Sequence, residues 1–127
     1  MINRTMIIPL SCFTILISQP FNTLLAQDIS HEREQATSLI YQGKIEDGLE
    51  KLKNMLKENP SDQKLLADYI VLSYNNARFS KTDLKYLQQI KPAEFPEYAQ
   101  INLIKALRDQ KEFGLAQSYI QQFAKQR

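Results

Sequence analysis

The stretch from Ala36 to Pro60 constrains the possible fold of this chain more than any other part of the sequence. It has the pattern of two short amphipathic helices joined at Gly43 and closed by Asn59 and Pro60. Gly43 lacks a Cβ and enters the left-handed backbone conformation at little cost, which suits the end of a helix. Pro60 has no backbone N–H and disfavours helix at the residue before it. These residues therefore predict one helix–turn–helix unit.

The rest of the sequence continues the helical pattern. Residues 63–76 are apolar nearly all round, which predicts a helix buried on more than one side. A capping box begins a predicted helix over residues 80–90, and two more are expected over 96–107 and 113–123. No run of alternating apolar residues indicates a strand. The sequence thus predicts an all-α fold of six helices in three pairs.

The last two predicted helices differ in how much apolar surface they carry. The fifth is expected to bury an apolar face of five residues: Tyr98, Ile101, Leu103, Ile104 and Leu107. The sixth carries more apolar residues than one contact face needs: Phe113, Leu115, Ala116, Tyr119, Ile120 and Phe123. The end of a helical array normally presents a polar outer face. We therefore expect self-association through residues 112–124, or a chain that is a piece of a longer array.

Self-comparison of the sequence finds a period near 32 residues, close to the roughly 34 of tetratricopeptide repeats. That family places small residues where paired helices cross and a proline after them, and Ala36, Gly48 and Pro60 match these positions. Ala116 matches in the third unit, whereas Thr82 replaces the small residue in the second. The chain therefore resembles a tetratricopeptide array, which implies a short right-handed superhelix. The implied repeats cover about residues 29–60, 61–92 and 94–127, within a domain of residues 27–127.

Residues 1–26 have the order of a secretory signal peptide. Arg4 is followed by an apolar run from Met6 to Ile17 and a polar approach to Ala26. This run is shorter than the roughly 20 residues that a bilayer requires, so cleavage after Ala26 is favoured over a membrane anchor. Lipidation of Cys12, the only cysteine, stays open as the weaker alternative. We expect the mature chain in the periplasm.

A sharper family resemblance lies on the third predicted helix. Residues 59–73, NPSDQKLLADYIVLS, are similar to the amino-terminal repeat region of the outer-membrane export porins for poly-β-1,6-N-acetylglucosamine. Further similar segments are Ala77-Arg78, Pro96-Glu97-Tyr98, Lys105-Ala106-Leu107-Arg108 and Phe113-Gly114-Leu115-Ala116. The resemblance covers about residues 29–125. It departs after the third helix, where Asn75-Asn76-Ala77 replaces the usual aromatic residue and glycine.

In that family the periplasmic repeats precede a membrane β-barrel and help pass the partly deacetylated polymer from a periplasmic deacetylase to the pore. No barrel strands occur before Arg127, so the resemblance does not imply a pore. It implies a non-enzymatic periplasmic scaffold that binds the aminosugar polymer, its deacetylase or both, with association to the outer membrane as a further option. The alternative is a general envelope protein–protein adaptor of the same repeat type, unrelated to polysaccharide.

Tyrosines provide the candidate binding residues. In a repeat array the first helix of each pair lines the concave surface, where ring faces can stack on sugars. Tyr41, Tyr69, Tyr74 and Tyr98 are expected there, and Tyr69 is favoured because Asp68 and Asn75 are its neighbours. We expect this concave surface to contact polymer or a partner protein. Core packing would explain the same tyrosines.

Catalytic and metal chemistry has few candidate residues. The only histidine, His31, stands beside Glu32 near the start of the first predicted helix, where a solvated or capping role is expected. A single histidine with scattered carboxylates does not form a zinc ligand set, and three isolated glycines do not form a phosphate loop. Removal of residues 1–26 takes one base and no acid, so the net charge falls from +2 to +1. We expect no enzyme activity, metal, cofactor or nucleic-acid partner.

Overall fold

The computed structural model describes residues 29–126. The chain divides into two compact units, residues 1–34 and residues 35–127, and the packing described below is that of the second unit. The predicted signal peptide and Cys12 lie outside the described residues. The all-α prediction is confirmed for the described part of the chain, where six helical segments and no strand occur.

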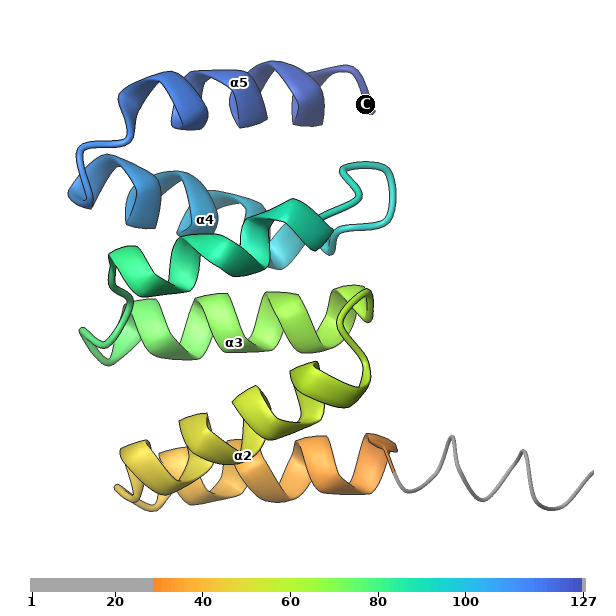
Figure 1. Ribbon diagram of the computed structural model, residues 1–127, viewed down its shortest axis with the longest axis vertical. Helices are drawn as coiled ribbons and strands as arrows, with labels where there is room; N and C mark the ends of the chain where they lie inside the picture. Colours follow the sequence, from red (N-terminus) through yellow and green to blue (C-terminus); the bar gives the residue numbers. More distant parts are fainter. Residues whose placement is uncertain (1–28, 127) are drawn as a thin grey trace, which may run out of the picture. The chain divides into compact units, whose positions relative to one another are not determined.

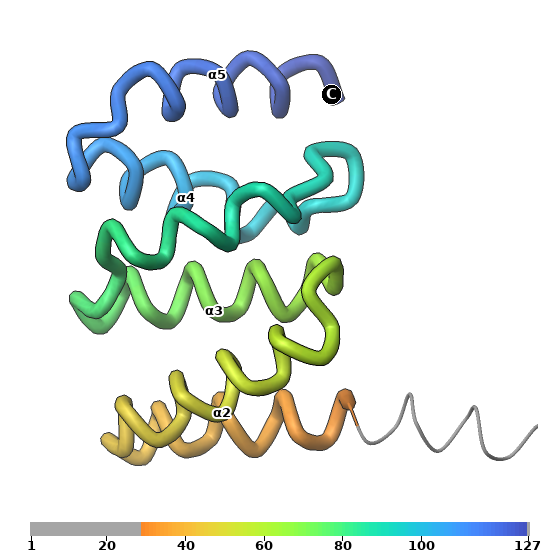
Figure 2. Tube along the Cα trace, viewed as in Figure 1, coloured from red at the N-terminus to blue at the C-terminus, as the bar shows by residue number. Residues whose placement is uncertain are grey.

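The helices of the second unit pack on one another in chain order (Figures 1 and 2). A first helix covers residues 29–41, of which residues 35–41 belong to this unit. It is followed by α2 (Ile45–Glu58), α3 (Gln63–Asn75), the 3₁₀ helix η1 (Lys81–Gln89), α4 (Glu97–Asp109) and α5 (Phe113–Ala124). α3 packs against both α2 and α4, and α4 also packs against α5. α3 and α4 can therefore each bury one face against an earlier helix and another against a later one.

Three turns of the same geometry recur along the chain. Gly43, Ala77 and Lys111 have φ angles of +91°, +58° and +62°. Each turn closes with the same pair of backbone hydrogen bonds: Gly43 to Ile40 and Lys44 to Leu39, Ala77 to Tyr74 and Arg78 to Ser73, and Lys111 to Arg108 and Glu112 to Leu107. These bonds satisfy carbonyl groups at the helix ends.

The three turns are evenly spaced, and this spacing defines the structural period. Ala77 lies as far after Gly43 as Lys111 lies after Ala77. The interval is about 34 residues, the length typical of tetratricopeptide repeats. Positions separated by this interval are called one period apart below.

The shorter period predicted from the sequence was therefore wrong. It matches the spacing between Pro60 and Pro92, which follow helices of unequal length. α2 has 14 residues, whereas η1 has 9. Because η1 is the shorter helix, Pro92 does not occupy the repeat position of Pro60.

Gly48 allows a close crossing between the helix of residues 29–41 and α2. A Cβ atom at Gly48 would lie 2.6 Å from the carbonyl oxygen of Ala36 and would also meet the side chain of Ile40. Both Gly48 and Ala36 are buried. The prediction of small residues at this helix crossing is confirmed.

α3 forms the centre of the buried core, as its apolar sequence predicts. The carboxylate of Asp62 caps this helix by accepting hydrogen bonds from the backbone N–H groups of Lys64 and Leu65, each at 3.1 Å. Its fully or nearly fully buried residues are Leu65, Leu66, Ala67, Tyr69, Ile70, Leu72 and Ser73. A helix covered on several faces can hold neighbouring helices together on both sides.

η1 is wound as a 3₁₀ helix, so residues three apart align along its length. One such row contains Asp83, Tyr86 and Gln89, and its members contact α3 or the turn before it. Asp83 accepts a hydrogen bond from the Tyr69 hydroxyl at 2.6 Å, and the ring of Tyr86 lies edge-on to Tyr69 at 5.1 Å between centroids. The predicted capping box of Ser80 and Asp83 is present.

The apolar face predicted for the fifth helix was wrong at two positions. Tyr98 and Ile101 are 59% and 61% exposed, whereas Leu103 and Leu107 are buried. At 3.6 residues per turn, Ile101 points about 200° around the helix from Leu103. α4 instead completes its buried face with the small residues Ala99 and Ala106.

Candidate functional site

Two hydrogen-bonded side-chain pairs join α3 to α4 at the surface. The Tyr98 hydroxyl donates to Asp68 Oδ1 at 2.8 Å. The Asn102 Nδ2 group donates to Asn75 Oδ1 at 3.0 Å. We call these four residues the α3–α4 strip: Asp68, Asn75, Tyr98 and Asn102.

The strip contains three of the residues predicted for the binding surface, Asp68, Asn75 and Tyr98. Asn102 was missed, because its sequence neighbours give no sign that it faces Asn75. Tyr41 is 79% exposed and lies one period before Asn75, at the same repeat position. No hydrogen bond links Tyr41 to the strip within the described part of the chain.

Tyr69 does not present a ring face to a ligand, which corrects the prediction that favoured it. This side chain is only 2% exposed. Its hydroxyl is bonded to Asp83, and its ring packs against Tyr86. The neighbouring helix η1 covers it, so Tyr69 is a core residue.

Tyr98 has the geometry of an exposed binding platform. Its hydroxyl is held by Asp68, yet more than half of the side chain is exposed. The hydrogen bond restricts ring rotation without covering the ring, which reduces the ordering cost of binding. The ring face and the nearby carboxylate can contact a ligand that carries both an apolar face and a cationic group.

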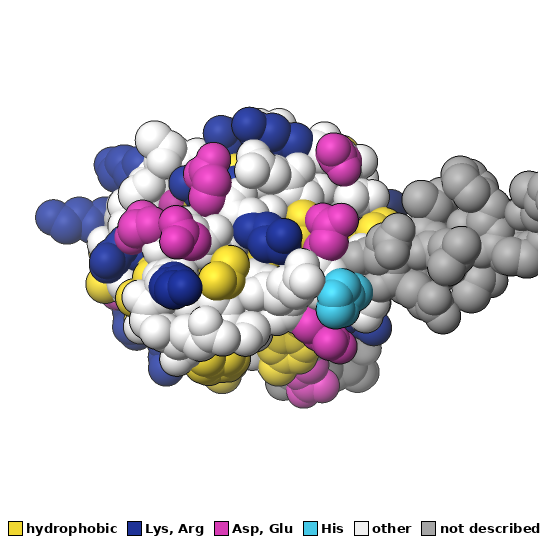
Figure 3. All heavy atoms as spheres, turned by 90° about the horizontal axis from the view of Figure 1, so that it is seen from below, with side chains coloured by type: hydrophobic (Ala, Val, Ile, Leu, Met, Phe, Trp, Pro, Cys, Tyr) yellow, Lys and Arg dark blue, Asp and Glu magenta, His cyan; other side chains and the backbone are white. Residues whose placement is uncertain are grey.

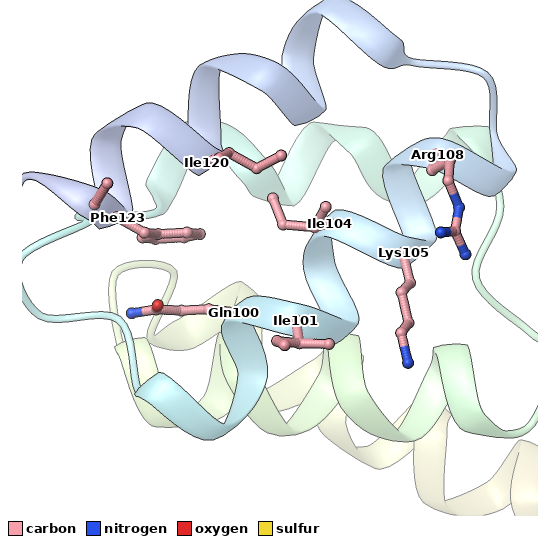
Figure 4. Close-up of a pocket in the computed structure, with 8 residues that line it drawn as sticks. Gln100, Ile101, Ile104, Lys105, Arg108, Ile120 and Phe123 are labelled. Carbon is pink, nitrogen blue, oxygen red and sulfur yellow. The ribbon is translucent and has the colours of Figure 1, made fainter.

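A second candidate feature is an apolar groove of about 470 Å³ between α4 and α5 (Figure 4). Ile104 of α4 and Ile120 of α5 point toward one another across it, and Phe123 lies at one end. Lys105 and Arg108 extend from the side of α4. We call this feature the α4–α5 groove. The lining residues used below are Ile101, Ile104, Lys105, Arg108, Ile120 and Phe123.

The groove was not predicted as a binding site, although Ile120 and Phe123 lie in the segment expected to self-associate. The sequence placed Ile101 and Ile104 on one buried face of a helix, whereas neither is fully buried and both line the groove. A comparison of residues one period apart could have indicated that these isoleucines occupy positions where another helix packs. Such a comparison aligns Ile101 and Ile104 with Ala67 and Ile70 of the buried helix α3.

The side chains with raised pKa values are tyrosines outside both features. Burial, and then the hydrogen bond to the Asp83 carboxylate, raise the pKa of Tyr69 well above its ordinary value. Burial also raises the pKa of Tyr86 and of Tyr119. The Tyr119 hydroxyl donates to the Leu87 carbonyl at 3.0 Å. These tyrosines therefore connect η1 to α3 and α5.

Charge on the face drawn in Figure 3 is mixed, with Lys and Arg side chains interspersed among Asp and Glu. Over residues 29–126, no cluster of three or more His, Cys, Asp or Glu side chains could hold a metal ion. His31 is exposed, and it takes part in an interaction. None of the described helices combines the length and apolar character needed to cross a membrane.

Comparisons of the chain with protein-family models, with curated proteins and with solved structures find no match. The α3–α4 strip and the α4–α5 groove are thus defined by their own geometry.

Proposed function

We propose that residues 27–127 form a tetratricopeptide array with three helix pairs and the right-handed superhelical winding of that family. The left-handed turns at Gly43, Ala77 and Lys111 support this proposal, because their even spacing of about 34 residues equals the family period. Gly48 and Ala116, which are two periods apart and both buried, support it further.

We propose that the chain is a non-enzymatic periplasmic scaffold that assists export of poly-β-1,6-N-acetylglucosamine. The observation that carries this proposal is the exposed Tyr98 ring anchored to Asp68. A pyranose presents an apolar C–H face that can stack on such a ring. Partial deacetylation exposes ammonium groups, which the Asp68 carboxylate can bind through charge-assisted hydrogen bonds.

The cellular setting of this proposal follows from the sequence resemblance. A signal peptide over residues 1–26 would deliver the chain to the periplasm. The deacetylase that generates the ammonium groups is the expected protein partner, and association with the outer membrane would place the array near the point of export. The strip would then hold the polymer between these two steps.

Titration with glucosamine oligomers tests the sugar proposal. We expect partly deacetylated oligomers to shift the amide resonances of residues 63–78 and 97–105, and fully acetylated oligomers to shift them less. Tyr98→Ala should weaken binding about tenfold through loss of the ring, and Asp68→Asn should remove the preference for deacetylated oligomers because the charge is lost.

Phe113→Ala is the matched control, because Phe113 is a 61% exposed aromatic side chain outside the strip. It should leave oligomer binding unchanged. If the Tyr98→Ala and Phe113→Ala variants bind equally well, or if the oligomers shift no resonance of α3 and α4, the sugar proposal is wrong.

The alternative is an envelope protein–protein adaptor unrelated to polysaccharide. The α4–α5 groove favours it, since exposed apolar surface bordered by charge is typical of a protein interaction site. Retention of the chain on the polymer or its deacetylase would support the first function. Binding to a protein helix with indifference to both would support the adaptor.

A further inference from the structure

The α4–α5 groove consists of repeat positions that are buried elsewhere in the array. Ile101 and Ile104 correspond to Ala67 and Ile70 one period earlier, and Ile120 corresponds to Leu52 two periods earlier. Ala67, Ile70 and Leu52 are each 0% exposed. In contrast, Ile101 is 61% exposed and Ile120 is 47% exposed.

A following helix explains this difference. α3 packs onto α2, and α4 packs onto α3, so the earlier positions lie in a stack that continues. Among residues 29–126, no helix packs onto α4 and α5 in the way that α3 packs onto α2. The groove therefore has the position and the apolar lining of a surface that receives one more helix.

The groove also carries charge that the earlier positions lack. Lys105 and Arg108 correspond to Val71 and Tyr74 one period earlier, and these are uncharged. Both basic side chains are exposed, and the acidic group beside Arg108 is its sequence neighbour Asp109, at 3.8 Å. A helix that filled this groove would meet two cations along one flank.

We propose that the α4–α5 groove binds an amphipathic helix of a partner protein. The helix would place apolar residues at spacings of three and four over Ile101, Ile104 and Ile120, and carboxylates opposite Lys105 and Arg108. This inference is separate from the sugar proposal, because no strip residue lines the groove.

Charge distinguishes this partner from a second copy of the chain. The exposed apolar residues of α5 could pair with another α5, as the sequence prediction of self-association through residues 112–124 supposes. However, α5 contains no Asp or Glu between Phe113 and Ala124. The helical residues of a paired α5 would therefore place no new carboxylate opposite Lys105 and Arg108.

Two synthetic helical peptides, each of about five turns, provide the test. They share one stripe of leucines and differ only in a flank of glutamates or of lysines. In calorimetric titration at low salt, the acidic peptide should bind the full chain about tenfold more tightly than the basic peptide, since each exposed ion pair contributes modestly. The double substitution Lys105→Glu with Arg108→Glu should reverse this preference.

Lys57→Glu with Lys64→Glu is the matched control, because it makes the same net-charge change at exposed lysines outside the groove. It should leave the preference unchanged. Ile120→Ser should weaken both peptides and leave the thermal unfolding temperature nearly unchanged. The inference is overturned if neither peptide binds, if both bind equally, or if sedimentation shows a dimer that Ile120→Ser dissociates.

Discussion

The Tyr69 hydroxyl and the Asp83 carboxylate are joined between α3 and η1, where both side chains are almost completely buried. The carboxylate also accepts a bond from the Ser80 backbone N–H at 2.8 Å. A buried carboxylate is costly unless its lone pairs are satisfied. This residue pair therefore attaches a short 3₁₀ helix, which has few hydrogen bonds of its own, to the core.

Tyr69→Phe should lower the free energy of unfolding by about 1.5–3 kcal/mol at pH 7, because Asp83 loses a buried donor. Urea denaturation measures the change. Tyr86→Phe is the control, since the Tyr86 ring contacts Tyr69 and its hydroxyl forms no hydrogen bond within residues 29–126. An equal loss in both variants would show that removal of a tyrosine hydroxyl, and not loss of the bond to Asp83, is responsible.

The difference in unfolding free energy between the wild type and Tyr69→Phe should depend on pH. The pKa of Tyr69 is raised by folding above the ordinary value of about 10. Above that pH the unfolded chain releases the tyrosine proton while the folded chain retains it, so unfolding is favoured as pH rises. The advantage of the wild type over Tyr69→Phe should shrink by at most about 1.4 kcal/mol per pH unit above pH 10. A constant difference between pH 8 and pH 11 would contradict this assignment.

Among the helical elements, two glycines with the same local preference have different tertiary surroundings. Gly48 and Gly114 both lie inside helices, where glycine is intrinsically unfavourable by about 1 kcal/mol relative to alanine. A Cβ at Gly48 would collide with the preceding helix, whereas a Cβ at Gly114 would meet nothing within 4 Å. The crossing of two helices, and not the helix itself, requires Gly48.

Gly48→Ala should therefore destabilise the protein by about 1–3 kcal/mol through overpacking. Gly114→Ala should stabilise it by about 0.5–1 kcal/mol through helix propensity. Thermal and urea unfolding of both variants give the comparison. Stabilisation by Gly48→Ala would mean that the crossing is looser than the structure shows.

Across the stacked helices, residues at the same repeat position contribute unequally to the stability of the fold. Leu52 of α2 and Ile120 of α5 are two periods apart. Leu52 is fully buried, and Ile120 is nearly half exposed. The two residues differ in exposure because α3 packs against α2, whereas no later helix packs against α5 in the described part of the chain.

Leu52→Ala should lower the free energy of unfolding by about 2–5 kcal/mol, as expected for a large core residue. Ile120→Ala should lower it by less than about 1 kcal/mol, because little buried volume is lost. Urea unfolding measures both changes. Addition of the acidic helical peptide should increase the effect of Ile120→Ala, and an unchanged effect would argue against the groove as its binding site.

Local residue types were enough to predict the helical class, the turn at Gly43, the capping box at Ser80, and the buried nature of α3. These features depend on contacts within a few residues, so the amino-acid sequence specifies them directly. The repeat period was predicted slightly too short, because proline spacing depends on the length of η1, which the sequence pattern did not reveal.

Packing between helices, in contrast, decides which tyrosine is exposed. The sequence predicted both Tyr69 and Tyr98 for the binding surface. In the structure η1 covers Tyr69, whereas the hydrogen bond to Asp68 holds Tyr98 at the surface. The α4–α5 groove likewise depends on which helices lie next to one another in space. Such contacts join residues of different helices that are distant in the sequence, and no local pattern encodes them.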